Sequence, residues 1–268
     1  MKKIIHGDCL EKMKNIDNKS INMILCDLPY GSTQNKWDSI IDLEKLWEQY
    51  ERIIKDNGTI ALTAQTPFDK VLGYSNLKLL KYEWIWQKDK CTGHLNANKM
   101  PMKEHENILV FYKKLPVYNP QKFKGNPCHS RGNIVGYEDK TSSNYGKFIN
   151  VNTDGDMKFP KSIIKFNKDT GLHPTQKPVA LFEYLIKTYT NEGDLVLDNC
   201  AGSGTTAIAC LNLNRNFICI EKDDKYFEVM KNRIKEHIRG LRETKNKIDF
   251  TDLMDNKGDK KNGWTVKS

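Results

Sequence analysis

The stretch that decides the fold is LVLDNCAGSGTT, Leu195 to Thr206. The apolar residues Leu195 to Leu197 predict a short buried strand, and the pattern from Ala207 to Leu213 predicts a helix directly after the stretch. Gly202 and Gly204 fall in the turn between them, where glycine lets the backbone approach a ligand at the carboxyl end of a strand. The segment therefore predicts a ligand-binding loop in an α/β protein.

The next predicted strand adds a carboxylate beside this loop. Phe217 to Ile220 is apolar and ends at Glu221, which can accept hydrogen bonds from ribose hydroxyls. The loop is not G-x-G-x-x-G and lacks the lysine of a P-loop, so pyrophosphate binding is disfavoured. Taken singly, the loop could equally be a tight turn and Glu221 a solvated acid. In this order, the features indicate a nucleoside-binding unit.

The first half of the chain carries a second strand that ends in a chemically active loop. Ile21 to Leu25 predicts a buried strand, followed by the rigid sequence DLPYG, Asp27 to Gly31. A helix over Asp42 to Lys55 and a strand over Thr59 to Thr63 complete a βαβ pattern. We therefore expect an α/β fold with a Rossmann-like, doubly wound, mostly parallel sheet. If DLPY has only a structural role, it is an Asp-x-Pro turn with a packed tyrosine.

Composition divides the chain into a core, an insertion and a tail. We expect a catalytic domain over 1–238, which contains a basic insertion over 113–172, and a polar C-terminal tail over 239–268. A long loop is expected from Lys88 to Glu104. The net charge of +9 and the 10% of aromatic residues suit a polyanionic partner whose bases can stack.

Cysteine usage and hydropathy argue against several classes of protein. The seven cysteines form no C-x-x-C pair, so we expect buried free thiols, a reducing cytoplasm and no metal site. No apolar run reaches the roughly 18 residues of a membrane span, so we expect no membrane partner.

Three segments in register resemble the β-class of S-adenosylmethionine-dependent DNA amino-methyltransferases. They are DLPY at 27–30, HPTQKP at 173–178 and the glycine loop at 198–206, in the order that this class shows. The similarity covers about Lys2 to Ile238, and three motifs in order make coincidence improbable. Leu28 departs from the proline usual in the family at that position.

The resemblance implies methyl transfer to the exocyclic amine of a flipped-out base. The Asp27 carboxylate and the Leu28 carbonyl would accept the two amino N–H groups, Pro29 would fix the backbone, and Tyr30 would stack on the base. An acid at the first position resembles the adenine-N6 branch more than the cytosine-N4 branch.

The resemblance also assigns a cofactor and its contacts. Glu221 would bind the ribose of S-adenosylmethionine, and the glycine loop would surround its methionine part. The full set of expected cofactor residues is Asp8, Thr175, Lys177, Asp198, Ala201, Gly202, Ser203, Gly204, Thr205, Glu221, Lys222 and Tyr226. For Asp8 an ordinary helix cap is an equally good interpretation.

Double-stranded DNA is the expected partner, and a homodimer is possible because members of the class often pair. The insertion would recognise the target, with basic side chains that position the duplex through its phosphates. The candidate phosphate contacts are Lys122, Lys124, Arg131, Lys147, Lys158 and Lys161. Each of these is individually more typical of a solvated surface residue.

Three alternatives stay open at this point. A cytosine-N4 methyltransferase would differ only in the pocket for the flipped base. A methyltransferase acting on RNA or on a free nucleotide would have little affinity for duplex DNA. A nucleic-acid-binding subunit without catalysis would keep the fold, although its loops should then be degraded.

Overall fold

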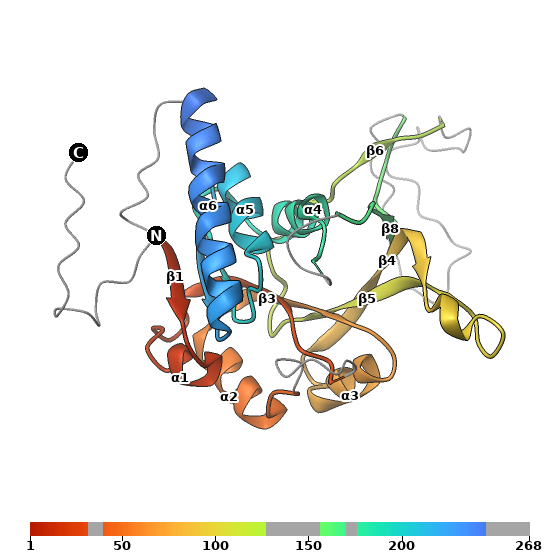
Figure 1. Ribbon diagram of the computed structural model, residues 1–268, viewed down its shortest axis with the longest axis horizontal. Coiled ribbons are helices and arrows are strands. Elements are labelled where there is room, and N and C mark those ends of the chain that lie inside the picture. The colour runs from red at the N-terminus through yellow and green to blue at the C-terminus, as the bar shows by residue number, and fades with distance from the viewer. Residues whose placement is uncertain (32–39, 127–155, 170–175, 245–268) are drawn as a thin grey trace, which may run out of the picture. The chain divides into compact units, whose positions relative to one another are not determined.

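An eight-stranded sheet with the order β1-β10-β9-β2-β3-β5-β4-β8 organises the chain. Figure 1 shows the ribbon of the chain with its helices. All neighbouring strands run parallel except β5, which is antiparallel to both β3 and β4. This confirms the predicted Rossmann-like, mostly parallel α/β fold. The computed structural model describes residues 1–31, 40–126, 156–169 and 176–244. The strands of the sheet are β1 (Lys2–His6), β2 (Ile21–Asp27), β3 (Ile54–Ala64), β4 (Leu80–Thr92), β5 (Lys103–Phe111), β8 (Ile163–Lys165), β9 (Leu195–Asp198) and β10 (Asn216–Glu221).

Helices cover both faces of the sheet, so the larger unit has two hydrophobic cores. Alternate residues of β2 supply them: Met23 and Leu25 belong to one core, Ile24 and Cys26 to the other. Helices α4 (Val179–Tyr189), α5 (Thr205–Asn212) and α6 (Asp224–Thr244) pack on the first face, and α1 (Cys9–Met13), α2 (Leu43–Ile53) and α3 (Phe68–Ser75) on the second. Burial on both faces explains why these strands are almost continuously apolar.

The connections run in opposite directions from two central strands. From β2 the chain passes through α2 to β3 on one side, and from β9 it passes through α5 to β10 on the other. Because β2 and β9 are parallel neighbours, their carboxyl ends border a common crevice. Such a switch point is where ligands bind in open α/β sheets, and here it places Asp27 and Asp198 side by side in the topology.

A second compact unit comprises residues 120–161. Its described part contains a small antiparallel pair, β6 (Phe123–Lys124) with β7 (Met157–Lys158). This unit falls within the insertion expected over 113–172, although β8 from that range pairs with β4 in the main sheet. The predicted domain boundaries remain a prediction.

The region from Lys88 to Glu104 differs from the expected long loop. Strand β4 continues to Thr92 and β5 begins at Lys103, so the two strands form a hairpin and the connection between them is limited to residues 93–102, which include the short 3-10 helix η1 (His94–Asn96). Its polar sequence hides the strands because this part of the hairpin is largely exposed. Helix α6 likewise continues to Thr244, so the first residues of the expected polar tail are helical.

Candidate active site at the carboxyl ends of the central strands

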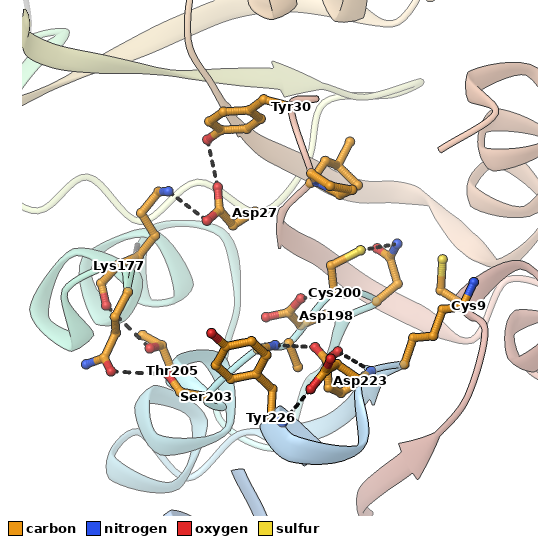
Figure 2. Close-up of a pocket in the computed structure, with 18 of the residues that line it drawn as sticks. Cys9, Asp27, Tyr30, Lys177, Asp198, Cys200, Ser203, Thr205, Asp223 and Tyr226 are labelled. Carbon is orange, nitrogen blue, oxygen red and sulfur yellow. Dashed lines mark hydrogen bonds and ion pairs between the residues drawn. The ribbon is translucent and has the colours of Figure 1, made fainter. Parts of the chain in front are cut away.

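A cavity of about 930 Å³ occupies the crevice at the switch point (Figure 2). It has the size of a pocket for a nucleoside-sized ligand. The predicted residues that line it are Asp8, Asp27, Leu28, Pro29, Tyr30, Lys177, Asp198, Ala201, Gly202, Ser203, Thr205, Glu221, Lys222 and Tyr226. Thr175 lies outside the described residues. The two loops identified from the sequence therefore share one cavity.

Two glycines with positive φ shape the turn between β9 and α5 in different ways. Gly202 has a φ of 51°, and a Cβ there would meet nothing within 4 Å. Gly204 has a φ of 81°, and its Cβ would lie 2.7 Å from Cγ of Met230. Gly202 therefore leaves space beside the cavity, whereas Gly204 lets α5 approach α6. The cofactor contact expected at Gly204, which does not line the cavity, stays a prediction.

Asp198 is a nearly inaccessible carboxyl group in the cavity wall, 3% exposed. Its Oδ1 accepts a hydrogen bond of 3.1 Å from the Cys200 backbone N–H, and its Oδ2 accepts one from the Thr206 hydroxyl. Burial outweighs these hydrogen bonds and raises the pKa of Asp198 to about 7. Its charge therefore responds to small changes in its surroundings near neutral pH.

Glu221 joins the glycine loop to the turn after β10. Its Oε2 accepts a 2.7 Å hydrogen bond from the Gly202 N–H, and its Oε1 accepts a 2.8 Å hydrogen bond from the Asp223 N–H. Burial raises the pKa of this carboxyl group despite both hydrogen bonds. The Lys222 backbone N–H also lowers the pKa of this carboxyl group, and of the roughly four acceptor positions of a carboxylate the described part of the chain leaves one for a ligand hydroxyl.

The outer wall of this part of the cavity is polar. Asp8 caps α1 by accepting a 3.0 Å hydrogen bond from the Leu10 N–H, as its ordinary interpretation predicts. It also pairs with Lys222 at 3.1 Å, and both side chains are well exposed. Tyr226 lies in the first turn of α6, where its N–H donates to the Asp223 side chain. These residues border the side of the cavity near Glu221.

Ser203 and Thr205 are held by protein groups in addition to lining the cavity. The Ser203 hydroxyl donates to Gln176 over 3.1 Å. Arg233 in α6 donates to the carbonyl and hydroxyl oxygens of Ser203 and to the Thr205 hydroxyl, over 3.1 to 3.2 Å. Neither Gln176 nor Arg233 was among the predicted contacts. Gln176 lies within the HPTQKP motif, whereas Arg233 could not be found from the motif because only the fold brings α6 to the glycine loop.

The DLPY tetrapeptide leaves β2 with a buried anchor and a stacked ring. Leu28 is 3% exposed and packs into the core, while the Tyr30 ring stacks on Phe68 with centroids 5.4 Å apart. The Tyr30 hydroxyl donates to Oδ1 of Asp27 over 2.7 Å. Burial, followed by the nearby carboxylates of Asp27 and Glu106, raises the pKa of Tyr30 well above its usual range, so the phenol stays protonated.

Lys177 crosses from the start of α4 to the tetrapeptide. Its ammonium group lies 2.7 Å from Oδ2 of Asp27 and 3.2 Å from Oε2 of Glu106, and 5.6 Å from the centre of the Tyr30 ring. Glu106 also pairs with Lys88 at 2.5 Å. The cofactor contact expected at Lys177 stays a prediction, but its principal partner in the structure is Asp27.

No sequence pattern indicated that Glu106 and Lys88 belong to the site. Both lie in a polar stretch in which a charged residue is usually solvated, yet they are 6% and 3% exposed. Thr63 was also missed, and its hydroxyl donates to Oδ1 of Asp27 from the end of the neighbouring strand β3. The pairing of β2 with β3 could have suggested this contact once the register was known.

The candidate DNA contacts lie on the unit of residues 120–161. The described members are Lys122, Lys124, Lys158 and Lys161, while Arg131 and Lys147 fall outside the described residues. Lys122 lies 4.7 Å from the Phe159 ring centre, and Lys124 pairs with Asp156 at 3.5 Å. Their roles toward DNA stay predictions.

In the described part of the chain, no group of three or more His, Cys, Asp or Glu side chains is placed to hold a metal ion. Within the same ranges, no helix has both the length and the apolar character needed to cross a bilayer.

A family model described as DNA methylase matches residues 21–232, which is most of the chain. The chain therefore belongs to the DNA methylase family, and the resemblance to DNA amino-methyltransferases is confirmed.

The chain is also similar in sequence or structure to individual DNA methyltransferases. The chain is 28% identical over 256 residues to type II methyltransferase M.HpaI of Haemophilus parainfluenzae, covering 89% of this chain and 76% of that protein. It is 28% identical over 252 residues to DNA adenine methyltransferase YhdJ of Escherichia coli (strain K12), covering 85% and 81%. The crystal structure of the M1.HpyAVI-SAM complex shares 26% identity with a TM-score of 0.60, covering 87% of this chain and all of that one.

Proposed function

We propose that this protein transfers a methyl group from S-adenosylmethionine to N6 of adenine in double-stranded DNA. The observation that carries the proposal is the shared cavity, in which the tetrapeptide headed by Asp27 and the glycine loop after Asp198 face the same space. A relative named as a DNA adenine methyltransferase and a similar structure solved with S-adenosylmethionine support the choice of base and cofactor.

The residues around the glycine loop fit S-adenosylmethionine. Glu221 keeps that one acceptor position for a ribose hydroxyl, and Gly202 leaves open space at the cavity wall. Asp198 supplies a carboxylate for the positively charged methionine end, and Asp8 and Tyr226 border the Glu221 side. When bound, this cofactor supplies an electrophilic methyl group on a cationic sulfur.

The residues around Asp27 fit an exocyclic amine. The nitrogen lone pair of such an amine is delocalised into the base, so it must be oriented before it can attack a methyl group. A carboxylate that accepts an amino N–H favours a localised lone pair on nitrogen. Asp27 is held for this role by hydrogen bonds from Tyr30 and Thr63 and by the Lys177 ammonium.

Double-stranded DNA is the substrate that the family and the charge of +9 support. The base must leave the duplex to reach a cavity at the end of β2, because its reacting atom is otherwise paired. Assembly into a homodimer and a cytoplasmic location remain predictions.

Transfer of isotope label from methyl-labelled S-adenosylmethionine tests the substrate class. Duplex DNA, single-stranded RNA and free adenosine are offered in parallel at equal adenine concentration. We expect label in duplex DNA only. Label in RNA or adenosine but not in DNA would overturn the proposed substrate, and no label in any of them would favour a nucleic-acid-binding subunit.

A further inference from the structure

Four charged side chains form a continuous row that begins at Asp27 and runs into the protein. Lys177 lies 2.7 Å from Asp27 and 3.2 Å from Glu106, and Glu106 lies 2.5 Å from Lys88. Lys177, Glu106 and Lys88 have side chains only 6%, 6% and 3% exposed. The row holds two acids and two bases, so its formal charge is zero. Burying four charges is costly unless each is paired, and this order pairs every one.

The members of the row come from four separate segments. Asp27 ends β2, Lys88 belongs to β4, Glu106 belongs to β5, and Lys177 precedes α4. Gln65 donates a further 2.9 Å hydrogen bond to Glu106 Oε1, the oxygen that also faces Lys88. Glu106 is therefore fixed from two sides on one oxygen, which leaves its other oxygen directed at Lys177.

The charge states of the row depend on one another. Burial lowers the pKa of Lys177, but Asp27 and Glu106 outweigh burial and raise it. Burial raises the pKa of Glu106, but Lys177 and Lys88 outweigh it and lower it. The pKa of Lys88 is lowered, mainly by burial. The Glu106 carboxylate acts in the opposite direction, and the nearby Lys168 ammonium lowers this pKa further. Asp27 and, after it, Glu106 thus keep the Lys177 side chain in its ammonium form.

The hydrogen bonds to Asp27 leave a defined position for a ligand. Its Oδ1 accepts from the hydroxyls of Tyr30 and Thr63, and its Oδ2 accepts from Lys177. A carboxylate oxygen has two acceptor positions, so, with only the described residues counted, Oδ1 is filled and Oδ2 retains one. The free position lies on the oxygen that Lys177 holds.

We infer that Glu106 and Lys88 are positioning residues for methyl transfer: they hold the Lys177 ammonium against Oδ2 of Asp27, so that one acceptor position faces the target amine. This inference rests on the proposed function. Both residues line the cavity, and in this role they act through Lys177. Small displacements of a reacting group have large effects on rate, about 100-fold for 1 Å.

Charge balance gives a sharp mutational test. Glu106→Gln leaves the row with a net charge of +1, and Lys88→Met leaves it at −1, whereas the double variant is neutral again. We expect each single change to lower the single-turnover rate on duplex DNA by about 10- to 100-fold. The double variant should recover most of that loss, because Asp27 and Lys177 then form a balanced pair.

A pH profile separates positioning from a structural role. In the described ranges, the titratable groups that face Lys177 are Asp27, Tyr30 and Glu106, with Lys88 behind Glu106. Removing the Glu106 charge lowers the pKa of Lys177, so its ammonium is lost at lower pH. The rate of Glu106→Gln should therefore fall on the alkaline side at lower pH than that of the wild type.

Matched controls are available on strand β4. Glu83→Gln and Lys81→Met make the same chemical changes at exposed positions and should leave rate and pH profile unchanged. The affinity for S-adenosylmethionine, measured by calorimetry, should be unchanged in all variants. Thermal melting gives the folded fraction, and the neutral double variant remains informative if a single variant folds poorly.

The outcomes distinguish this inference from the proposed function. A wild-type protein that methylates no DNA would overturn the proposed function itself. An active wild type together with a Glu106→Gln variant that keeps the wild-type rate and pH profile would overturn only the positioning role. So would a rate that falls only in proportion to the folded fraction, with the pH profile unmoved. A displaced alkaline limb with recovery in the double variant is the expected result.

Discussion

At the scale of single residues, Asp198 shows how burial turns an ordinary acid into a group that titrates near neutral pH. Its carboxyl is 3% exposed and its pKa is raised to about 7, with burial as the largest cause. In the unfolded chain the same group loses its proton near pH 4. Because the unfolded state releases this proton first, Asp198 makes the free protein less stable as the pH rises from about 4 towards 7.

Binding of S-adenosylmethionine should depend on the same proton. The methionine end of this cofactor is cationic and favours the ionised carboxylate, so affinity should increase with pH. Between about pH 6 and pH 7.5 we expect an increase of at most roughly tenfold. Calorimetric titration at the two pH values measures it. Asp198→Asn should bind more weakly and show a flatter dependence, and an equally steep dependence in that variant would assign the proton to another group.

At the scale of secondary-structure elements, the packing of α5 against α6 depends on a position that cannot carry a side chain. Gly204 precedes α5 with a φ of 81°, and its Cβ would lie 2.7 Å from Met230 in the middle of α6. An L-residue is strained in this backbone conformation, and Met230 is fully buried, so it has little room to move. The glycine loop and helix α6 are therefore coupled through this contact.

Gly204→Ala should lower the free energy of unfolding by about 1 to 3 kcal/mol through strain and overpacking. Gly240→Ala is the matched control, because Gly240 lies within α6 and its Cβ would meet nothing within 4 Å. That change should instead stabilise the protein by about 0.5 to 1 kcal/mol, since alanine is the better helix former. Urea unfolding of both variants measures the difference. Equal effects at the two positions would contradict this role for Gly204.

Some secondary-structure elements could be predicted from the sequence and others could not. The strands ending at Asp27 and Asp198 were predictable because their apolar runs stop abruptly at polar, glycine- or proline-containing turns. The apolar parts of the next hairpin, Glu83 to Trp86 and Ile108 to Tyr112, also predicted strands, whereas its polar end with Lys88 and Glu106 resembles a loop. Lys177 was recognised only through a motif. Its ion pairs required the arrangement of β2, β5 and α4, which no local pattern contains.

At the scale of the whole molecule, the order of the strands explains why distant segments form one site. The chain leaves β2 and β9 in opposite directions, so two loops separated by about 170 residues border one cavity. The sequence predicted both loops and the α/β class, whereas their meeting depends on the pairing of Met23 with Val196 and Ile24 with Leu197. The net charge of +9 concerns the partner and has no bearing on the fold.

Nucleoside mass spectrometry of DNA tests the central claim most directly. Unmethylated duplex DNA is incubated with S-adenosylmethionine and the wild type, Asp27→Asn, or the exposed control Asp17→Asn. We predict that the wild type and the control both form N6-methyladenine. Asp27→Asn keeps the shape of the side chain but loses its charge, so its methylation rate should be lower by a factor of about 100 or more. N4-methylcytosine in place of N6-methyladenine would contradict the choice of base, and near-wild-type activity of Asp27→Asn would contradict the site.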